Sequence, residues 1–266
     1  MHKVMESLDV AAFGFGLAGN VTFDLFLYIH NKKRFVLKCK LKPICILVSM
    51  NVDEVISLLK QQSDAKYHAG MARFGIKNEK ALGIAVPKLR VLAKTIKKDH
   101  QLALQLWETG IHEARILASL VADPKLVTPQ LMDSWVNDFT SWDVCDQACG
   151  NLFDRTPYII EKANEYSLSE REFVKRAGFV LMAEYSMHNK KAPDEEFINF
   201  MPVIEREVRD DRNFVKKAVN WSLRQIGKRN ALLKDIAIQT AERIALQDSK
   251  AAKWIAADAL RELRKR

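Results

Sequence analysis

Apolar residues recur at intervals of three and four through residues 50–266, and turn-forming Gly, Pro or Asp residues separate the stretches in which they do so. This spacing places apolar side chains on one face of a helix, whereas the alternation typical of a strand is scarce. The chain from residue 50 onward is therefore predicted to be one all-α domain with short connections. The predicted helices span residues 52–62, 87–98, 101–108, 111–121, 128–137, 141–152, 157–166, 170–188, 194–208, 213–227, 231–246 and 249–263, with a turn around 67–74.

One five-residue phrase recurs in this pattern. Residues 173–177 read Phe-Val-Lys-Arg-Ala, residues 214–218 read Phe-Val-Lys-Lys-Ala 41 positions later, and residues 252–255 form a looser copy. Self-similarity at roughly 40 residues is typical of stacked helix pairs of the HEAT or armadillo kind. The sequence therefore predicts an α-solenoid of HEAT-like antiparallel helix pairs, whose equivalent positions line one concave surface.

The net charge of +9 is unevenly distributed. Residues 1–49 carry 7 Lys/Arg against 3 Asp/Glu, residues 50–169 carry 14 against 15, and residues 170–266 carry 21 against 15. Within the helical part, the excess positive charge thus lies in the last third. A basic face suits a polyanion such as DNA, RNA or an acidic membrane surface, and a merely solvated basic surface is equally compatible with these numbers.

The first 49 residues do not continue the repeat. Val10–Tyr28 is apolar, but Asn20 and Asp24 interrupt it, so it is neither a clean transmembrane span nor a clean signal peptide. We expect residues 1–49 to be an extension that precedes a natural start at Met50. The alternative is a tail that associates with a membrane.

The four cysteines do not form a metal-binding or disulfide pattern. Cys145 and Cys149 lie four apart on one face of a predicted helix, while Cys39 and Cys45 lie in the first segment. No CxxC pair and no histidine cluster completes a zinc site. We expect reduced cysteines, a cytoplasmic protein, and neither a metal nor an organic cofactor.

Four polar residues fall at the same place in successive repeats, and together they would form one column on the concave surface. They are Arg115, Asp146, Arg176 and Lys217. Cations in a row would follow the phosphates of a nucleic acid, whereas a single carboxylate among them would repel the phosphates. This mismatch is the best indication of catalysis that the residues offer.

Two tryptophans flank the predicted column. Trp142 lies four residues before Asp146, and Trp221 lies four residues after Lys217, so each shares a helix face with its neighbour. Indole rings offer flat surfaces for sugars and bases. Ser141 could cap the helix of Asp146, whose dipole would favour an ionised carboxylate. Such a carboxylate can stabilise an oxocarbenium ion and orient water.

Each of these residues also has an ordinary structural interpretation. A tryptophan on a helical repeat can fill the core, and an aspartate near a helix start can cap it. Arg176 and Lys217 could pair with acidic neighbours such as Glu172 or Glu207. Asp143 is a rival carboxylate, although it points about 100° away from the adjacent indole on a helix.

Four segments in this order resemble the AlkD-type DNA alkylation repair glycosylases, which are built from HEAT-like helical repeats. They are residues 82–87 (Leu-Gly-Ile-Ala-Val-Pro), 141–146 (Ser-Trp-Asp-Val-Cys-Asp), 173–177 and 217–224 (Lys-Ala-Val-Asn-Trp-Ser-Leu-Arg). The resemblance covers residues 50–263. It implies a monofunctional DNA glycosylase of base excision repair, which hydrolyses the N-glycosidic bond of cationic N3- or N7-alkylated purines such as 3-methyladenine and 7-methylguanine.

The resemblance also implies roles for individual residues. Asp146 matches the catalytic carboxylate of the family, Trp142 and Trp221 match its active-site indoles, and Arg176 matches its DNA-contacting arginine. The family acts on duplex DNA without flipping the lesion into a pocket, and a purine that is already cationic needs no general acid to leave.

Further DNA contacts are expected from Lys217, Arg224, Arg115 and Phe74. Phe74 stands where the family often has tyrosine, which removes a hydroxyl and leaves the range of lesions open. The expected partner is double-stranded DNA with alkylated bases, bound by a monomer without a membrane. The alternative is a non-catalytic HEAT-repeat scaffold that binds DNA structures or proteins.

Overall fold

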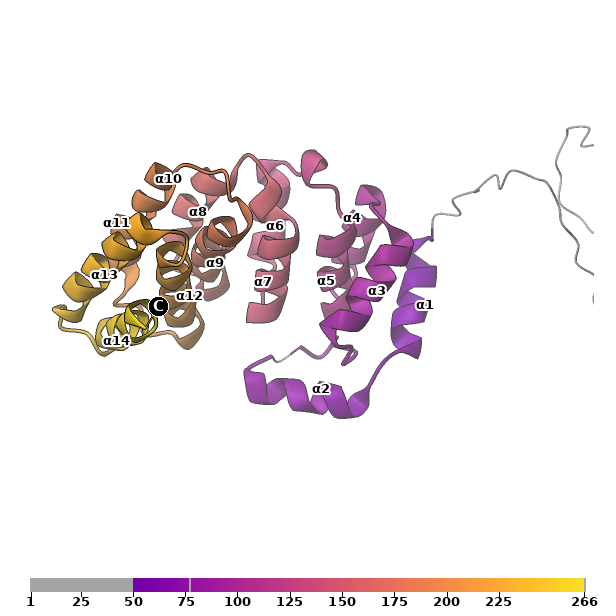
Figure 1. Ribbon diagram of the computed structural model, residues 1–266. Coiled ribbons are helices and arrows are strands. Elements are labelled where there is room, and N and C mark those ends of the chain that lie inside the picture. The colour runs from indigo at the N-terminus through magenta and orange to yellow at the C-terminus, as the bar shows by residue number, and fades with distance from the viewer. Residues whose placement is uncertain (1–49, 77, 266) are drawn as a thin grey trace, which may run out of the picture. The chain divides into compact units, whose positions relative to one another are not determined.

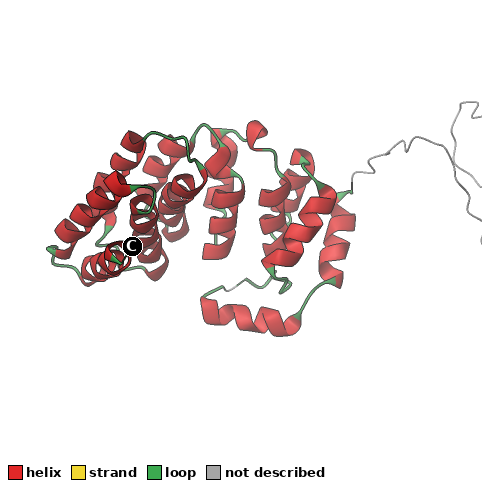
Figure 2. Cartoon of the chain, in the orientation of Figure 1, coloured by secondary structure: helices red, strands yellow, loops and turns green. Residues whose placement is uncertain are grey.

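The structure is a computed structural model that describes residues 50–76 and 78–265 (Figure 1). The expected extension, the apolar stretch 10–28 and two of the cysteines lie outside the described residues. The described part belongs to one compact unit and contains fourteen α-helices and three short 3-10 turns, without a β-strand (Figure 2). The prediction of an all-helical fold is confirmed. None of the described helices is long and apolar enough to cross a membrane.

The helices follow the predicted apolar periodicity closely. They are α1 (Val52–Gln61), α2 (Ala65–Met71), α3 (Val86–Ile96), α4 (His100–Glu108), α5 (His112–Val121), α6 (Pro129–Asn137), α7 (Trp142–Asn151), α8 (Ile159–Ser167), α9 (Glu172–His188), α10 (Asp194–Ile198), α11 (Phe200–Glu207), α12 (Asn213–Gly227), α13 (Ala231–Ala245) and α14 (Lys250–Arg264). The 3-10 turns are η1 (Ala72–Phe74), η2 (Pro124–Leu126) and η3 (Phe153–Arg155).

Side-chain caps fix where several of these helices begin. The side-chain oxygens of Asn51, Asp99, Thr128, Asn230 and Ser249 accept backbone N–H groups in the first turns of α1, α4, α6, α13 and α14. Each cap satisfies a donor that has no partner within the helix, and its loss typically costs about 1 kcal/mol.

The segment expected as a turn at 67–74 is instead helical. Asp64 caps α2, because its Oδ1 accepts the backbone N–H groups of Lys66 and Tyr67, each at 2.9 Å. The helix then tightens into η1 and ends at Gly75, whose φ of +75° lies in the left-handed region. The apolar pattern of α2 is too short to mark a helix, so the capping contact decides its structure.

The single helix expected over 194–208 is two helices, α10 and α11, joined at Asn199. Pro202 explains the break. Proline lacks an N–H, and its ring clashes with the carbonyl four residues earlier, which here belongs to Ile198.

Alternate helices form two packed layers. In one layer α3, α5, α7, α9, α12 and α14 each contact the next, and they succeed one another in chain order across the body (Figure 1). The other layer includes α1, α4, α8, α11 and α13, which pack on the first. This arrangement is that of stacked helix pairs, as the repeat predicted.

A single main core runs between the layers. The indoles of Trp107 and Trp135 lie at its centre, stacked with ring centroids 3.9 Å apart. Cys145 and Cys149 are free thiols buried in the same core, which confirms their expected role as small core residues.

The repeated phrase has a physical counterpart in the pair α9 and α12. Phe173 and Phe214, the first residues of its two copies, pack with ring centroids 5.6 Å apart. The lysines at the third position are structural in both copies. Lys216 lies over the ring of Trp254, with Nζ 5.1 Å from the centroid, and Lys175 is buried.

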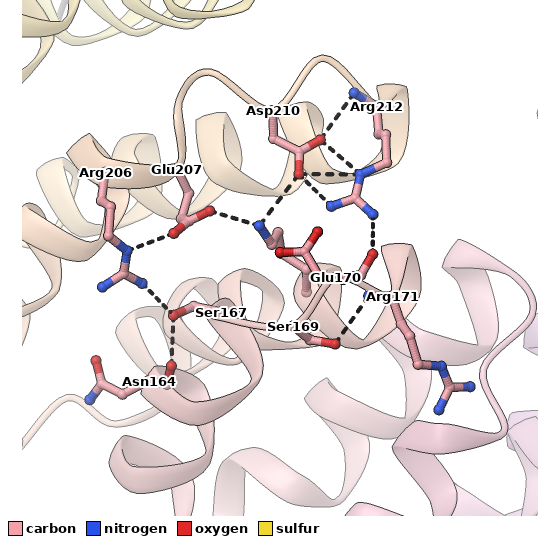
Figure 3. A network of polar contacts seen from close by, with 10 residues as sticks. Asn164, Ser167, Ser169, Glu170, Arg171, Arg206, Glu207, Asp210 and Arg212 are labelled. Atoms are coloured by element: carbon pink, nitrogen blue, oxygen red, sulfur yellow. Dashed lines mark hydrogen bonds and ion pairs between the residues drawn. The ribbon is translucent and has the colours of Figure 1, made fainter.

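Lys175 belongs to an ion-pair network that ties α9 to the connection between α11 and α12. Its Nζ donates to Glu207 at 2.8 Å and lies 3.6 Å from Asp210. Figure 3 shows Arg206 and Arg212 bound to these same two carboxylates. The third position of the phrase thus holds the fold together.

The segment that leads into α3 is held by a buried carboxylate. Glu113 of α5 accepts the backbone N–H groups of Leu82 at 2.8 Å, Gly83 at 2.7 Å and Ile84 at 3.1 Å. Gly83 has a φ of +76°, and a Cβ there would lie 2.2 Å from the carbonyl oxygen of Asp64. Only glycine fits at this position. The hydrogen bonds to Glu113 and the close approach of Gly83 to Asp64 together hold the α2 cap against α5.

Candidate functional site

A cavity of about 450 Å³ lies where η1 meets α7, α9 and α12. We refer to it as the central cavity. It is lined by Arg73, Phe74, Gly75, Trp142, Arg176, Asn213, Phe214 and Lys217. Four residues predicted for the site are therefore brought together here, and three of the eight lining residues are cations.

Arg176 connects the cavity to the predicted catalytic carboxylate. Its Nε and Nη2 donate to the two oxygens of Asp146 at 2.9 and 2.8 Å, and its Nη1 donates to the carbonyl oxygen of Phe214 at 2.6 Å. The alternative in which Arg176 pairs with Glu172 or Glu207 is wrong. Each of the three guanidinium nitrogens is bound by α7 or α12, so the group is held in one orientation at the cavity wall.

The ion pair is largely shielded from water. The Arg176 side chain is 7% exposed and the Asp146 side chain is 15% exposed. Burial raises the pKa of Asp146 above its usual value, because it outweighs the stabilising charge and hydrogen bonds of Arg176. The sequence also predicted that Ser141 could cap the helix of Asp146. Ser141 occupies the N-cap position of α7, but its side chain makes no capping hydrogen bond.

Trp142 forms the opposite wall of the cavity. Its Nε1 donates to the carbonyl oxygen of Phe74 at 2.9 Å, and its ring lies 6.0 Å from the Arg176 guanidinium carbon. It also packs against a small apolar cluster that includes Met71 and Ile76. The indole therefore holds the η1 turn through this hydrogen bond and lies beside the guanidinium of Arg176.

The η1 turn rests on α12 through a close contact. A Cβ added to Gly75 would lie 2.6 Å from Cζ of the Phe214 ring, so the glycine is required both for this approach and for its positive φ. The backbone of Phe74 is thus held from two sides, while its side chain is 68% exposed at the cavity rim.

Lys217 reaches the cavity from α12 and is exposed. It makes no ion pair among the described residues. It is therefore a cation whose charge is available to a ligand.

Arg115 does not reach this site. Its guanidinium donates to the carbonyl oxygens of Trp107 at 3.4 Å and Asp138 at 3.0 Å, and to the Asp138 carboxylate at 3.2 Å. The predicted column therefore does not include Arg115. Asp146, the residue expected beside Arg115, has both carboxylate oxygens bound by Arg176. The long Arg115 side chain instead reaches the carbonyl oxygens of Trp107 and Asp138.

Arg224 and Trp221 also lie outside the central cavity. Arg224 pairs with Glu262 and lies 3.5 Å from Asp258, so α14 neutralises its charge. Trp221 is half-buried and packs on the main core. Of the two predicted indoles, the structure places only Trp142 at the cavity.

The sequence did not single out Arg73, Asn213, Phe214 or Gly75 for the site. Phe214 could have been found, because it opens a copy of the repeated phrase next to Lys217. The others come from η1 and from the first residue of α12, and no spacing in the sequence marks them as neighbours of α7.

No group of three or more His, Cys, Asp or Glu side chains in the described range is arranged to hold a metal ion. What the central cavity offers is positive charge, aromatic surface and one adjoining carboxylate. This set can bind a phosphate backbone and place a sugar beside a negative charge.

The two helical layers define a HEAT-like helical repeat protein, and the basic, aromatic cavity is its candidate functional site. The sequence profile of the family described as DNA alkylation repair enzyme matches residues 55–263, which is most of the chain. The chain therefore belongs to the DNA alkylation repair enzyme family, as the AlkD-type motifs predicted.

A solved structure has a similar fold. It is described as belonging to a new family of proteins related to the HEAT-like repeat DNA glycosylases with affinity for branched DNA structures. The TM-score is 0.68 at 18% identity, over 80% of this chain and 95% of that one. At this identity the likeness concerns the fold alone. No curated protein matches the sequence.

Proposed function

We propose that the protein is a DNA glycosylase that excises cationic N3- or N7-alkylated purines from duplex DNA by hydrolysis of the N-glycosidic bond, without flipping the base. The observation that carries this proposal is the Asp146–Arg176 pair beside a cavity that contains Trp142 and Lys217. Membership of the alkylation repair family gives the class of substrate.

The chemistry needs few protein groups. An alkylated purine carries a positive charge, so the bond from C1′ to the base nitrogen can break with both electrons going to the base, which leaves neutral. The sugar becomes an oxocarbenium ion. Water then forms the new bond at C1′ and releases a proton to solvent.

Asp146 supplies the negative charge that stabilises the sugar cation. Arg176 holds both carboxylate oxygens in place and lines the cavity in which a phosphate of the lesioned strand would bind. Lys217 and Arg73 add further phosphate contacts. The exposed Phe74 ring would contact a deoxyribose or a base.

A second candidate is a non-catalytic protein that binds DNA structures. Two observations favour it: both oxygens of Asp146 are engaged by Arg176, and Trp221 does not line the cavity. The solved relative is itself described by its affinity for branched DNA. In this case the central cavity would bind phosphates only.

The two candidates differ in what they do to methylated DNA. The test incubates the protein with duplexes that contain 7-methylguanine and measures released base by chromatography, alongside binding to matched unmodified duplexes and four-way junctions. The glycosylase predicts base release above the spontaneous rate. Tight junction binding with no base release would favour the second candidate and overturn the first.

A further inference from the structure

A second cavity, of about 590 Å³, lies beneath α2, and we refer to it as the α2 cavity. It shares Phe74 and Trp142 with the central cavity, so the two cavities adjoin at these aromatic residues. Its volume falls in the range of sites for small molecules. Much of its wall is apolar, with contributions from Met71, Ile84 and Ile116.

Charged and polar side chains interrupt this apolar wall: Asp64 and Lys66 at the start of α2, and the buried pair His112 and Asp143. His112 is 1% exposed, and its Nε2 lies 2.7 Å from Oδ2 of Asp143, whose side chain is 15% exposed. Asp143, the carboxylate that the sequence ranked second to Asp146, is thus the partner of a histidine that the sequence did not single out. No motif in the sequence includes His112.

This pair leaves two atoms without a partner. Neither Nδ1 of His112 nor Oδ1 of Asp143 forms a hydrogen bond within the protein, although both atoms are buried. Buried polar atoms are nearly always hydrogen-bonded, and each exception calls for an explanation. Both residues line the α2 cavity, so a ligand edge that carries a donor and an acceptor matches this unsatisfied pair.

The carboxylate is suited to accept such a donor. Burial alone raises the pKa of Asp143, but the hydrogen bond and charge of His112 outweigh it and lower the pKa below the usual value. Asp143 is therefore ionised at neutral pH, and its free oxygen is a strong acceptor.

The remaining surfaces define the shape of the ligand. Tyr67, Phe74 and Trp142 offer aromatic faces, which favour a flat ring. The aliphatic side chains offer space for an alkyl group. A hydrocarbon would leave the His112–Asp143 pair unsatisfied, and a phosphate would face a carboxylate. A flat heterocycle with a polar edge meets both requirements.

We propose that the α2 cavity binds the released N-alkylated purine base, with its polar edge on His112 and Asp143 and its ring among Tyr67, Phe74 and Trp142. The inference rests on the proposed glycosylase function, because it places the product of that reaction next to the central cavity. Residues of η1 and α7 that line the reaction site would also line the path by which the free base leaves.

Gly70 gives a clean way to block the cavity. It lies on α2 at the cavity wall, and a Cβ added there would meet no atom within 4 Å. Gly70→Leu therefore introduces its Cβ without a clash and places a large side chain at the cavity wall. Ala69→Leu is the matched control, because Ala69 is exposed on the same helix and does not line the cavity.

The experiment measures binding of free 3-methyladenine and 7-methylguanine to the full chain by calorimetry, without DNA. We expect saturable binding to wild type and Ala69→Leu, and at least tenfold weaker binding to Gly70→Leu and Asp143→Asn. Circular dichroism confirms that each variant is folded.

Three results would overturn the inference: no binding to wild type, unchanged binding to Gly70→Leu, or equal binding of unmodified adenine and guanine. Because DNA is absent, these results do not depend on excision. A protein that excises bases but binds none of them contradicts only this inference, whereas a protein that excises no base contradicts the proposed function.

Discussion

The Asp146–Arg176 pair gives the sharpest quantitative prediction, because its two side chains are buried and bind each other through two hydrogen bonds. Arg176→Met keeps much of the side-chain volume but removes the charge. Asp146 would then be left with neither oxygen paired and only 15% of its side chain exposed. Asp146→Asn instead removes the negative charge and leaves the arginine buried.

The expected magnitudes follow from the burial. Removal of one partner of a buried ion pair costs about 3–5 kcal/mol, because the other charge is left unpaired. Arg176→Met should lie in this range, since it also frees the carbonyl oxygen of Phe214. The double variant leaves no unpaired charge, so it should be more stable than the sum of the single changes by about 2–3 kcal/mol.

Urea unfolding followed by circular dichroism measures these free energies. The exposed pair Lys253–Asp248, with side chains 60% and 103% exposed, serves as a control cycle that should show no measurable coupling. A coupling below about 0.5 kcal/mol for Asp146 and Arg176 would refute the claim that they form a buried, mutually dependent pair.

Three further predictions concern the site and its surroundings. Trp142→Phe removes the N–H that binds the carbonyl of Phe74, so amide exchange in η1 should speed up about fivefold, which corresponds to about 1 kcal/mol; unchanged exchange would count against this contact. Burial raises the pKa of Glu184 to about 7, so the folded state keeps a proton that the unfolded state loses near pH 4.5. The free energy of unfolding should therefore fall by up to about 3 kcal/mol as the pH rises through this window, and Glu184→Gln should flatten the change. Lys217→Ala should weaken duplex DNA binding and reduce its salt slope by about 1, and an unchanged slope would mean that Lys217 contacts no phosphate.

The sequence predicted the helices well because their signal is local. Apolar spacing and caps act within one or two turns, so boundaries came within a few residues in most cases. The two errors, at α2 and at the junction of α10 and α11, are each caused by a single residue rather than by apolar spacing. Asp64 turns a short polar stretch into α2, and Pro202 divides a continuous apolar pattern into α10 and α11.

The site was predictable only as far as the repeat aligns neighbouring helices. An offset of 30 residues placed Asp146 and Arg176 at equivalent positions, and the structure joins them. An offset of 31 residues predicted that Arg115 lies beside Asp146, but Arg115 binds Asp138 instead. The same offset of 31 residues separates His112 and Asp143, and these two side chains are in contact. The alignment therefore gives the register of the helices, but it does not decide where a long side chain finds its partners.

The most direct test of the central claim is the single-turnover rate of 7-methylguanine release from methylated duplex DNA by wild type and by Asp146→Asn. Asp133→Asn is the matched control, because Asp133 also pairs with a buried cation, Lys162, but Lys162 lines neither cavity, whereas Arg176 lines the central cavity. If Asp146 stabilises the sugar cation, its loss should slow release by about 10² or more, while Asp133→Asn stays within about twofold of wild type. Equal rates for wild type and Asp146→Asn would contradict the account.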